Sequence, residues 1–130
     1  MVCLDTSFII DLLRGNNGAI NLKEFIDNNS EIINIPSMVV TEIVSGLLYK
    51  KSDNELKIVD NMFSSFNILN FDKESAFLAG EIESSLIKKG EKIDIEDIII
   101  AATTIINKDY LVTSNIKHFS KIHGLNVKGY

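Results

Sequence analysis

Three acidic residues stand where carboxylates can act together. Asp5 follows the short apolar run 1–4, Glu42 lies among apolar residues of a predicted helix, and Asp97 precedes three isoleucines and two alanines. Such surroundings place a carboxylate at the edge of a buried surface, where a partner must offset its desolvation. Without further cysteines or clustered histidines, these oxygens suit Mg²⁺ or Mn²⁺ rather than zinc. A divalent ion held by them would bind phosphate and activate water, so the pattern favours phosphodiester hydrolysis.

Each acid also has an ordinary structural interpretation. Asp5 can cap the helix that follows it, and Glu42 can pair with a lysine. Asp94 can cap the helix that contains Asp97, or it can join Asp97 as a further metal ligand because the two share one helix face. Glu96 is expected in solvent. Asp97 is the hardest of these acids to explain by structure alone, since its helix is mostly apolar and its position is near the positive helix end.

A second group of polar residues ends the predicted strand at 110–113. Thr113, Ser114 and Asn115 bring two hydroxyls and an amide to the sheet edge where the first carboxylate lies, and such groups can hold water or phosphate. As an alternative, Ser114 or Asn115 caps the next helix. His118 can face the same crevice, although it has no nucleophilic partner. The chain contains no glycine-rich phosphate loop and no GxSxG motif, which excludes NTPase and serine-hydrolase functions.

Alternating short strands and helices must position these residues. Apolar runs predict strands at 1–4, 31–35, 67–70, 110–113 and 125–128. Helical periodicity predicts helices at 8–15, 19–28, 36–52, 53–63, 72–90, 93–106 and 116–121. In the fifth helix the apolar stripe contains Ala76, Phe77, Ala79, Ile82 and Ile87. This order predicts an α/β fold, a three-layer α/β/α sandwich with a short parallel central sheet, whose ligands collect at the carboxyl ends of the strands.

The composition fits one folded module. The 130 residues are 45% apolar and 24% charged, which allows a single domain over 1–130 with its own core. The one cysteine, Cys3, is expected in that core rather than in a disulfide. Neither a run of about 18 apolar residues nor a leader pattern is found, so a cytoplasmic location without membrane contact is expected. A net charge of −5 argues against nucleic acid unless a metal neutralises the acids.

The motifs, in their order and spacing, resemble the PIN domain and especially the VapC-type toxins. The resemblance rests on 4–7 with 12–15, then on 41–42, 97–102 and 111–115, and it extends from residue 2 to about residue 127. It implies a PIN-like sandwich and a Mg²⁺- or Mn²⁺-dependent endoribonuclease that hydrolyses RNA. It also implies the toxin of a type II toxin–antitoxin pair, with a cognate antitoxin as inhibitor and with homodimer formation.

The same resemblance assigns roles to individual residues. It implies that Asp5, Glu42 and Asp97 bind the metal and act in catalysis. It implies that a second group of residues supports these carboxylates or orients the substrate: Thr6, Thr113, Ser114 and Asn115. The family often has a fourth acid at or near the position of Asn115. An amide brings no charge, so we expect one firmly bound ion, with any second ion arriving with the substrate.

The basic residues have two interpretations. Arg14, the only arginine, and the lysines at 50, 51, 88, 89 and 92 can contact RNA phosphates or form a solvated face. Tyr49 and the pair 62–63 are candidates for a dimer or antitoxin surface, with core packing as the alternative.

A catalytically weak or inactive PIN-fold binding module is one other function. A Mg²⁺-binding receiver-like signalling domain is another, although it would need an acidic pair where only Asp5 stands.

Overall fold

A parallel sheet of five strands forms the centre of the computed structural model, which describes residues 1–130. The strands are β1 (Val2–Leu4), β2 (Ile33–Pro36), β3 (Asn67–Leu69), β4 (Tyr110–Val112) and β5 (Asn126–Lys128). The helices are α1 (Thr6–Leu13), α2 (Asn17–Asn28), α3 (Ser37–Tyr49), α4 (Asp53–Ser64), α5 (Lys73–Lys88), α6 (Ile95–Ile106) and α7 (Ile116–Phe119). The strand order is β3-β2-β1-β4-β5, so β1 lies in the middle of the sheet.

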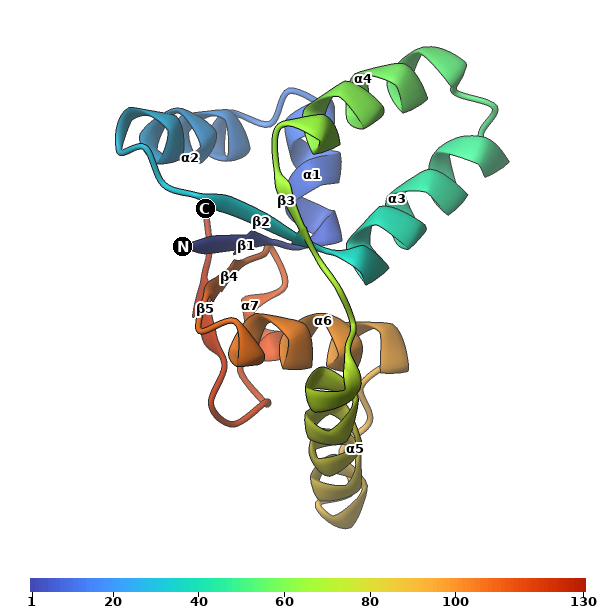
Figure 1. Ribbon diagram of the computed structural model, residues 1–130, viewed down its shortest axis with the longest axis vertical. Coiled ribbons are helices and arrows are strands. Elements are labelled where there is room, and N and C mark those ends of the chain that lie inside the picture. Colours follow the sequence, from blue (N-terminus) through green and yellow to red (C-terminus); the bar gives the residue numbers. More distant parts are fainter.

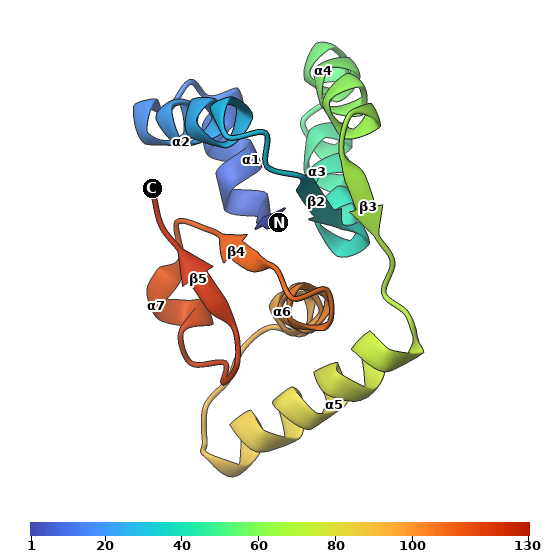
Figure 2. The ribbon, with the colours of Figure 1, turned by 60° about the vertical axis from the view of Figure 1, so that its left-hand side comes forward.

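Helices cover both faces of this sheet. The first four helices lie on one face and α5, α6 and α7 lie on the other, as two views of the ribbon show (Figures 1 and 2). The predicted three-layer α/β/α sandwich is therefore confirmed. Parallel pairing places the carboxyl ends of all five strands at the same edge, where the loops that lead into the helices begin.

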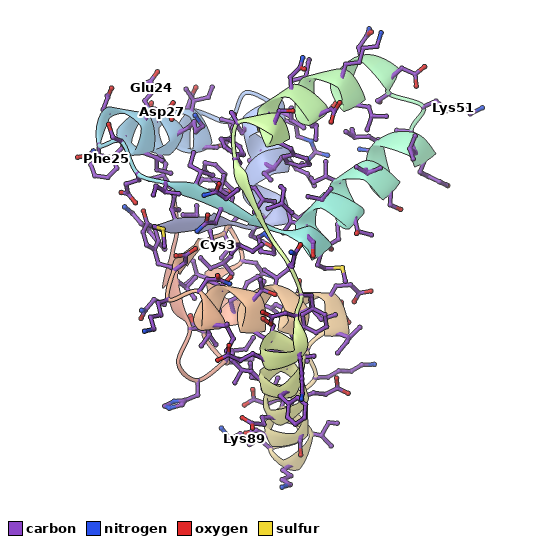
Figure 3. All side chains as sticks on the ribbon, in the orientation of Figure 1. Cys3, Glu24, Phe25, Asp27, Lys51 and Lys89 are labelled. Atoms are coloured by element: carbon purple, nitrogen blue, oxygen red, sulfur yellow. The ribbon has the colours of Figure 1, made fainter.

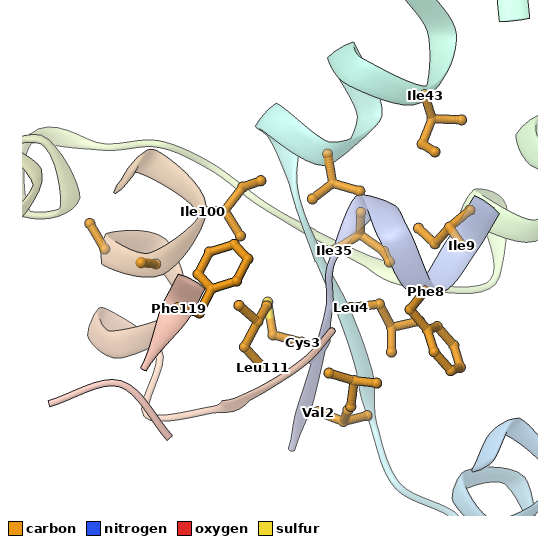
Figure 4. Packing of buried hydrophobic residues seen from close by; sticks show 14 of the residues in the cluster. Val2, Cys3, Leu4, Phe8, Ile9, Ile35, Ile43, Ile100, Leu111 and Phe119 are labelled. Carbon is orange, nitrogen blue, oxygen red and sulfur yellow. The ribbon is translucent and has the colours of Figure 1, made fainter. Parts of the chain in front are cut away.

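The core forms because successive residues of β1 point to opposite faces of the sheet. Val2 and Leu4 lie on the side of α1, whereas Cys3 lies on the side of α6 (Figure 4). All three are completely buried, as a central strand covered on both faces requires. Burial also raises the pKa of the Cys3 thiol to about 12, which keeps it protonated and unreactive.

The strands and helices begin and end close to their predicted positions, but the apolar stripe of α5 is partly wrong. Phe77 is 67% exposed and Ile87 is 66% exposed. The buried residues of α5 are Ser75, Ala79, Ile82 and Leu86, and α6 is its main contact. The face of α5 toward α6 thus combines two small residues with Ile82 and Leu86, and it leaves Ala76, Phe77 and Ile87 of the predicted stripe exposed. No helix of the structure has the length and apolar character needed to cross a membrane.

Candidate active site

Asp5 lies at the centre of the carboxyl edge of the sheet. It follows β1, and its backbone N–H donates to the Val112 carbonyl at the end of β4, 3.0 Å away. Its side chain makes no capping hydrogen bond to α1, although Asp5 stands at the N-cap position. The capping interpretation of this carboxylate is therefore wrong. The carboxylate instead lies at the carboxyl edge of the sheet, and the residue is only 5% exposed.

Two hydroxyls hold the Asp5 carboxylate by one of its oxygens. Oδ2 accepts hydrogen bonds from Thr113 Oγ1 at 2.7 Å and from Ser7 Oγ at 2.9 Å. These hydroxyls in turn accept the backbone N–H groups of Asn115 at 3.0 Å and Ser114 at 3.1 Å. Each hydroxyl donates its hydrogen bond to Asp5 and accepts one from a backbone N–H, so the bonds polarise one another. The turn after β4 is thereby fixed to the first carboxylate.

Glu42 reaches the same edge from α3. Its Oε1 accepts a hydrogen bond from Thr6 Oγ1 at 2.8 Å, which ties the first residue of α1 to the second turn of α3. The carboxylate is half-buried, and no lysine or arginine pairs with it, so the salt-bridge alternative is wrong. A hydroxyl donor satisfies one oxygen without cancelling the charge, which leaves Glu42 able to bind a cation.

Asp97 reaches the edge from the first turn of α6. Its Oδ2 lies 2.8 Å from Nε2 of His118, and both side chains are 24% exposed. Asp94 occupies the N-cap position of this helix but makes no side-chain capping bond. Asp94 and Glu96 are exposed, as expected for Glu96. Asp97 is thus the acid of α6 that is oriented by a neighbouring side chain.

Each of the three carboxylates keeps one oxygen without a hydrogen bond: Asp5 Oδ1, Glu42 Oε2 and Asp97 Oδ1. The buried side-chain atoms that lack partners are Ser75 Oγ and Asp109 Oδ1, so these three oxygens are open to solvent. No three acidic, histidine or cysteine side chains stand close enough to enclose a metal ion. Like charges oppose closer approach unless they share a cation.

Electrostatic interactions link the three acids. Burial is the main cause that raises the pKa of Glu42, the Thr6 hydrogen bond lowers it, and the charges of Asp5 and Asp97 raise it. Burial likewise raises the pKa of Asp97, against the lowering effect of its hydrogen bond to His118, and the charge of Asp5 raises it further. Asp5 therefore acts on both of the other carboxylates, and the three form one electrostatic group.

The raised pKa values predict how stability depends on pH in a chelating buffer. Above the ordinary pKa of 4.5 for Glu42, the folded chain binds more protons than the unfolded chain. The free energy of unfolding therefore falls as pH rises from that value through the raised folded pKa. Glu42→Gln removes the cost of ionising this side chain in the folded protein. At pH 7 the free energy of unfolding of the variant should therefore be higher than that of wild type by about 0.5 kcal/mol, a value discounted for solvent screening. Urea unfolding at pH 7 and pH 3 measures it. An equal advantage at both pH values would show that charge is not the cause.

Thr113→Val is expected to weaken the support of Asp5. The substitution preserves shape but removes a fully buried hydroxyl that donates to Asp5 and accepts from Asn115. We expect about 1–2 kcal/mol lower stability and roughly tenfold weaker Mn²⁺ binding, measured by urea unfolding and by titration. Thr103→Val is the matched control, because this buried hydroxyl bonds only to the Ile99 carbonyl of its own helix. Equal metal affinity in the two variants would contradict the role of Thr113.

The remaining predicted residues divide between this edge and the periphery. Ser114 and Asn115 are exposed; their backbone N–H groups join the network, and Asn115 makes no side-chain cap. Arg14 and Lys50 line one pocket with Glu42. Figure 3 shows Lys51 at the turn between α3 and α4 and Lys89 at the end of α5, both at outer ends of the molecule.

Sequence reasoning missed Ser7 and gave little weight to His118. Ser7 stands two residues after Asp5, where its type fits a helix start as well as a carboxylate support. His118 is three residues beyond Asn115, and only the fold brings it to Asp97. Tyr130 was also missed: its hydroxyl donates to Asp11 Oδ2 at 2.6 Å, and its ring packs edge-on against Phe8. The spacing Asp5-x-Ser7 is the one local signal that the sequence offered.

Comparison with known proteins decides the family. The PIN domain model matches residues 2–125, nearly the whole chain. This chain belongs to the PIN-domain family. It is 33% identical over 128 residues to the ribonuclease VapC of Rickettsia bellii, a match that covers 95% of this chain and 92% of that protein. It is 25% identical over 130 residues to the tRNA(fMet)-specific endonuclease VapC of Salmonella typhimurium, covering 98% and 96%.

Solved structures agree with this membership. The crystal structure of VapBC2 from Rickettsia felis bound to a DNA fragment from their promoter contains a similar chain, with a TM-score of 0.90 and 28% identity. That match covers all of this chain and 99% of the other. DNA-bound VapBC from Salmonella typhimurium has the same fold, with a TM-score of 0.86 and 24% identity over 98% and 96% of the two chains. The resemblance to VapC-type PIN domains is confirmed, and the receiver-like alternative is set aside.

Proposed function

We propose that this PIN domain is a divalent-metal-dependent endoribonuclease of the VapC type, which hydrolyses phosphodiester bonds in RNA. The observation that carries the proposal is the meeting of Asp5, Glu42 and Asp97 at one sheet edge, each with an oxygen open to solvent. The activities in the names of the VapC relatives support it. We extend it to the toxin role of a type II toxin–antitoxin pair.

The donor set fits a hard divalent cation. All three free atoms are carboxylate oxygens, and no thiol lies among them, so Mg²⁺ or Mn²⁺ suits them and zinc does not. Asp5 and Asp97 would hold the ion, and Glu42 would bind directly or through water. Asp94 is exposed and offers a weaker, additional ligand. With an amide at Asn115 in place of a fourth acid, one firmly held ion is the proposal.

The residues of the chain would prepare the ion site and the substrate. Thr113 and Ser7 hold Asp5 by Oδ2, which directs Oδ1 to the edge. Thr6 holds Glu42 in the same manner, and His118 holds Asp97. When bound, the ion would lower the pKa of a water and neutralise charge on the phosphate oxygens. The three carboxylates, fixed from behind by hydroxyls and a histidine, would lose little freedom when a metal binds.

Partners are part of the proposal. The VapBC complexes among the similar structures support a cognate antitoxin as the inhibitor. A homodimer is also proposed, and the exposed Leu48 and Tyr49 at the end of α3 offer an apolar surface for either partner. Met62 and Phe63 are half-buried, which agrees better with packing inside this chain than with a surface for a partner. The cytoplasm, where RNA and antitoxin would be met, is the proposed compartment.

A catalytically inactive PIN-fold binding module is the second candidate. Two observations favour it: Asn115 stands where the family often supplies an acid, and no three side chains already enclose a metal site. Mn²⁺ titration of wild type and Asp97→Asn separates the candidates. A nuclease should bind Mn²⁺ in a manner that depends on Asp97, whereas a module without an ion site should show the same weak binding in both proteins.

Cleavage of RNA tests the proposed function. Protein purified free of antitoxin is incubated with a randomised single-stranded RNA pool, with Mg²⁺, with Mn²⁺ or with chelator. We expect cleavage with either ion and none with chelator. Absence of cleavage under all three conditions, by a folded protein that binds Mn²⁺ through Asp97, would contradict the proposal.

A further inference from the structure

Tyr130 follows β5 and joins this last strand to the first two helices of the chain. Its hydroxyl donates to Asp11 Oδ2 of α1 at 2.6 Å, and its ring packs edge-on against Phe8, with the ring centroids 5.0 Å apart. It also lies against the first turn of α2, because a Cβ atom on Gly18 would stand 3.3 Å from the Tyr130 carbonyl carbon. The two ends of the sequence therefore meet at this residue.

The phenol of Tyr130 also lies beside the hydrogen-bond network of Asp5. Burial and the hydrogen bond to Asp11 raise the pKa of Tyr130 to about 12, whereas hydrogen bonding with the hydroxyls of Ser114 and Ser7 lowers it. Ser7 is the residue whose hydroxyl donates to Asp5 Oδ2 at 2.9 Å and accepts the Ser114 N–H at 3.1 Å. Tyr130 thus stands directly behind one of the two hydroxyls that hold the Asp5 carboxylate.

The start of α1 needs such a contact, because no side chain caps it. Asp5 occupies the N-cap position, but its carboxylate makes no capping hydrogen bond. The helix has only eight residues, and a helix of this length depends on tertiary contacts for its stability. Asp11 lies one turn after Ser7 on the same face of α1. A hydrogen bond at Asp11 and a ring contact at Phe8 therefore limit the movement of the turn that carries Ser7.

We propose that Tyr130 is a positioning residue for the ion site. It holds the first two turns of α1 against the turn after β4, and Ser7 in consequence keeps the Asp5 carboxylate directed to the ion. Tyr130 acts through Ser7 and contacts neither the ion nor RNA. The inference rests on the proposed function, because the ion that Asp5 binds is part of that proposal.

Tyr130→Phe tests the inference, since it keeps the ring against Phe8 and removes only the hydroxyl. Tyr110→Phe is the matched control: its hydroxyl donates to Glu31 at 2.8 Å, and it lies at the amino end of β4, away from the carboxyl edge. Both substitutions should lower the Tm by about 3 °C, because each removes one hydrogen bond to a carboxylate. Only Tyr130→Phe should weaken Mn²⁺ binding, by about fivefold in a titration followed by electron paramagnetic resonance.

The kinetics of Tyr130→Phe should show the same limited defect. Cleavage at low Mn²⁺ should fall by the factor found in the titration and should return to the wild-type rate at saturating Mn²⁺. The KM for RNA should not change, because Tyr130 does not contact the substrate. A loss that saturating Mn²⁺ does not restore, or a raised KM, would contradict a role through Asp5.

Substitutions of Asp11 separate the hydrogen bond of Tyr130 from the charge of its acceptor. Asp11→Ala removes the acceptor, so it should weaken Mn²⁺ binding as much as Tyr130→Phe, and the double variant should bind no more weakly than either single variant. Asp11→Asn keeps an acceptor oxygen without the charge and should stay within about twofold of wild type. Additive losses in the double variant would show that the two residues act separately and would overturn the inference.

Two results distinguish failure of this inference from failure of the proposed function. If wild type binds Mn²⁺ through Asp97 and Tyr130→Phe binds it equally well, Tyr130 only stabilises the fold. If wild type shows no such binding, the proposed function has failed, and hydrogen exchange of the Ser114 amide, which donates to Ser7, then tests the positioning. We expect this exchange to be about tenfold faster in Tyr130→Phe than in Tyr110→Phe. Equal exchange in the two variants would overturn the inference.

Discussion

Asp97→Asn is expected to lower kcat/KM for cleavage of single-stranded RNA by about a thousandfold, because it removes an ion ligand worth several kcal/mol of transition-state stabilisation. The amide can still contact His118, so the local geometry around α6 is largely kept. Its missing charge, however, weakens the hold on a divalent ion. Initial rates at saturating Mn²⁺, with the unfolding midpoint measured in parallel, give the result.

Glu96→Gln is the matched control for this prediction. It neutralises an exposed acid on the same turn of α6, next in sequence to Asp97. We expect its rate to stay within about twofold of wild type, since an exposed charge is well screened. If the two variants lost activity equally, general acidity of the α6 end would matter and the specific role of Asp97 would be wrong.

Removal of divalent ions is expected to abolish cleavage and to weaken RNA binding at least about tenfold. The chain has a net charge of −5, and three carboxylates face the proposed path of the phosphates. Without an ion these acids repel RNA, whereas a bound ion reverses the local charge. Stopped-flow anisotropy with a labelled RNA, recorded before cleavage, measures Kd in chelator and in Mn²⁺.

We also expect RNA binding to depend only weakly on salt concentration. A broad basic surface would make binding fall steeply with salt, because each neutralised phosphate releases counterions. Arg14 and Lys50 are the only basic residues that line the pocket beside Glu42, and the acid Glu55 lines it as well. The dependence of RNA binding on salt should therefore be shallow and its dependence on the divalent ion large. Tight RNA binding in chelator with a steep salt dependence would place the RNA on another surface of the molecule.

Much of the fold was predictable because its signals are local. The central strand is apolar without interruption, which is typical of a strand covered on both faces, and Asp5 had to follow it at the carboxyl edge. The three isoleucines after Asp97 predicted a buried helix with that acid at its start. Because parallel strands end at one edge, Thr113 was expected near Asp5, and the hydrogen bond between them follows from that topology.

Other features depend on contacts that no local pattern encodes. The hydrogen bond from His118 to Asp97 needs α7 to pack beside α6, 21 residues apart in sequence. Ser7 resembles an ordinary helix-start residue, and only the turn after β4 gives it a second partner. In α5, Phe77 and Ile87 share helical spacing with buried residues, yet Ser75 and Leu86 face α6 instead. Side-chain size alone could not choose between these two faces.

Anomalous scattering from crystals soaked in Mn²⁺ tests the central claim most directly. The claim is that Asp5, Glu42 and Asp97 share one divalent ion at the carboxyl edge of the sheet. We expect one strong peak among Asp5 Oδ1, Asp97 Oδ1 and the Glu42 carboxylate, with that peak lost in Asp97→Asn crystals. A peak at another place, or none here at saturating Mn²⁺, would contradict the account.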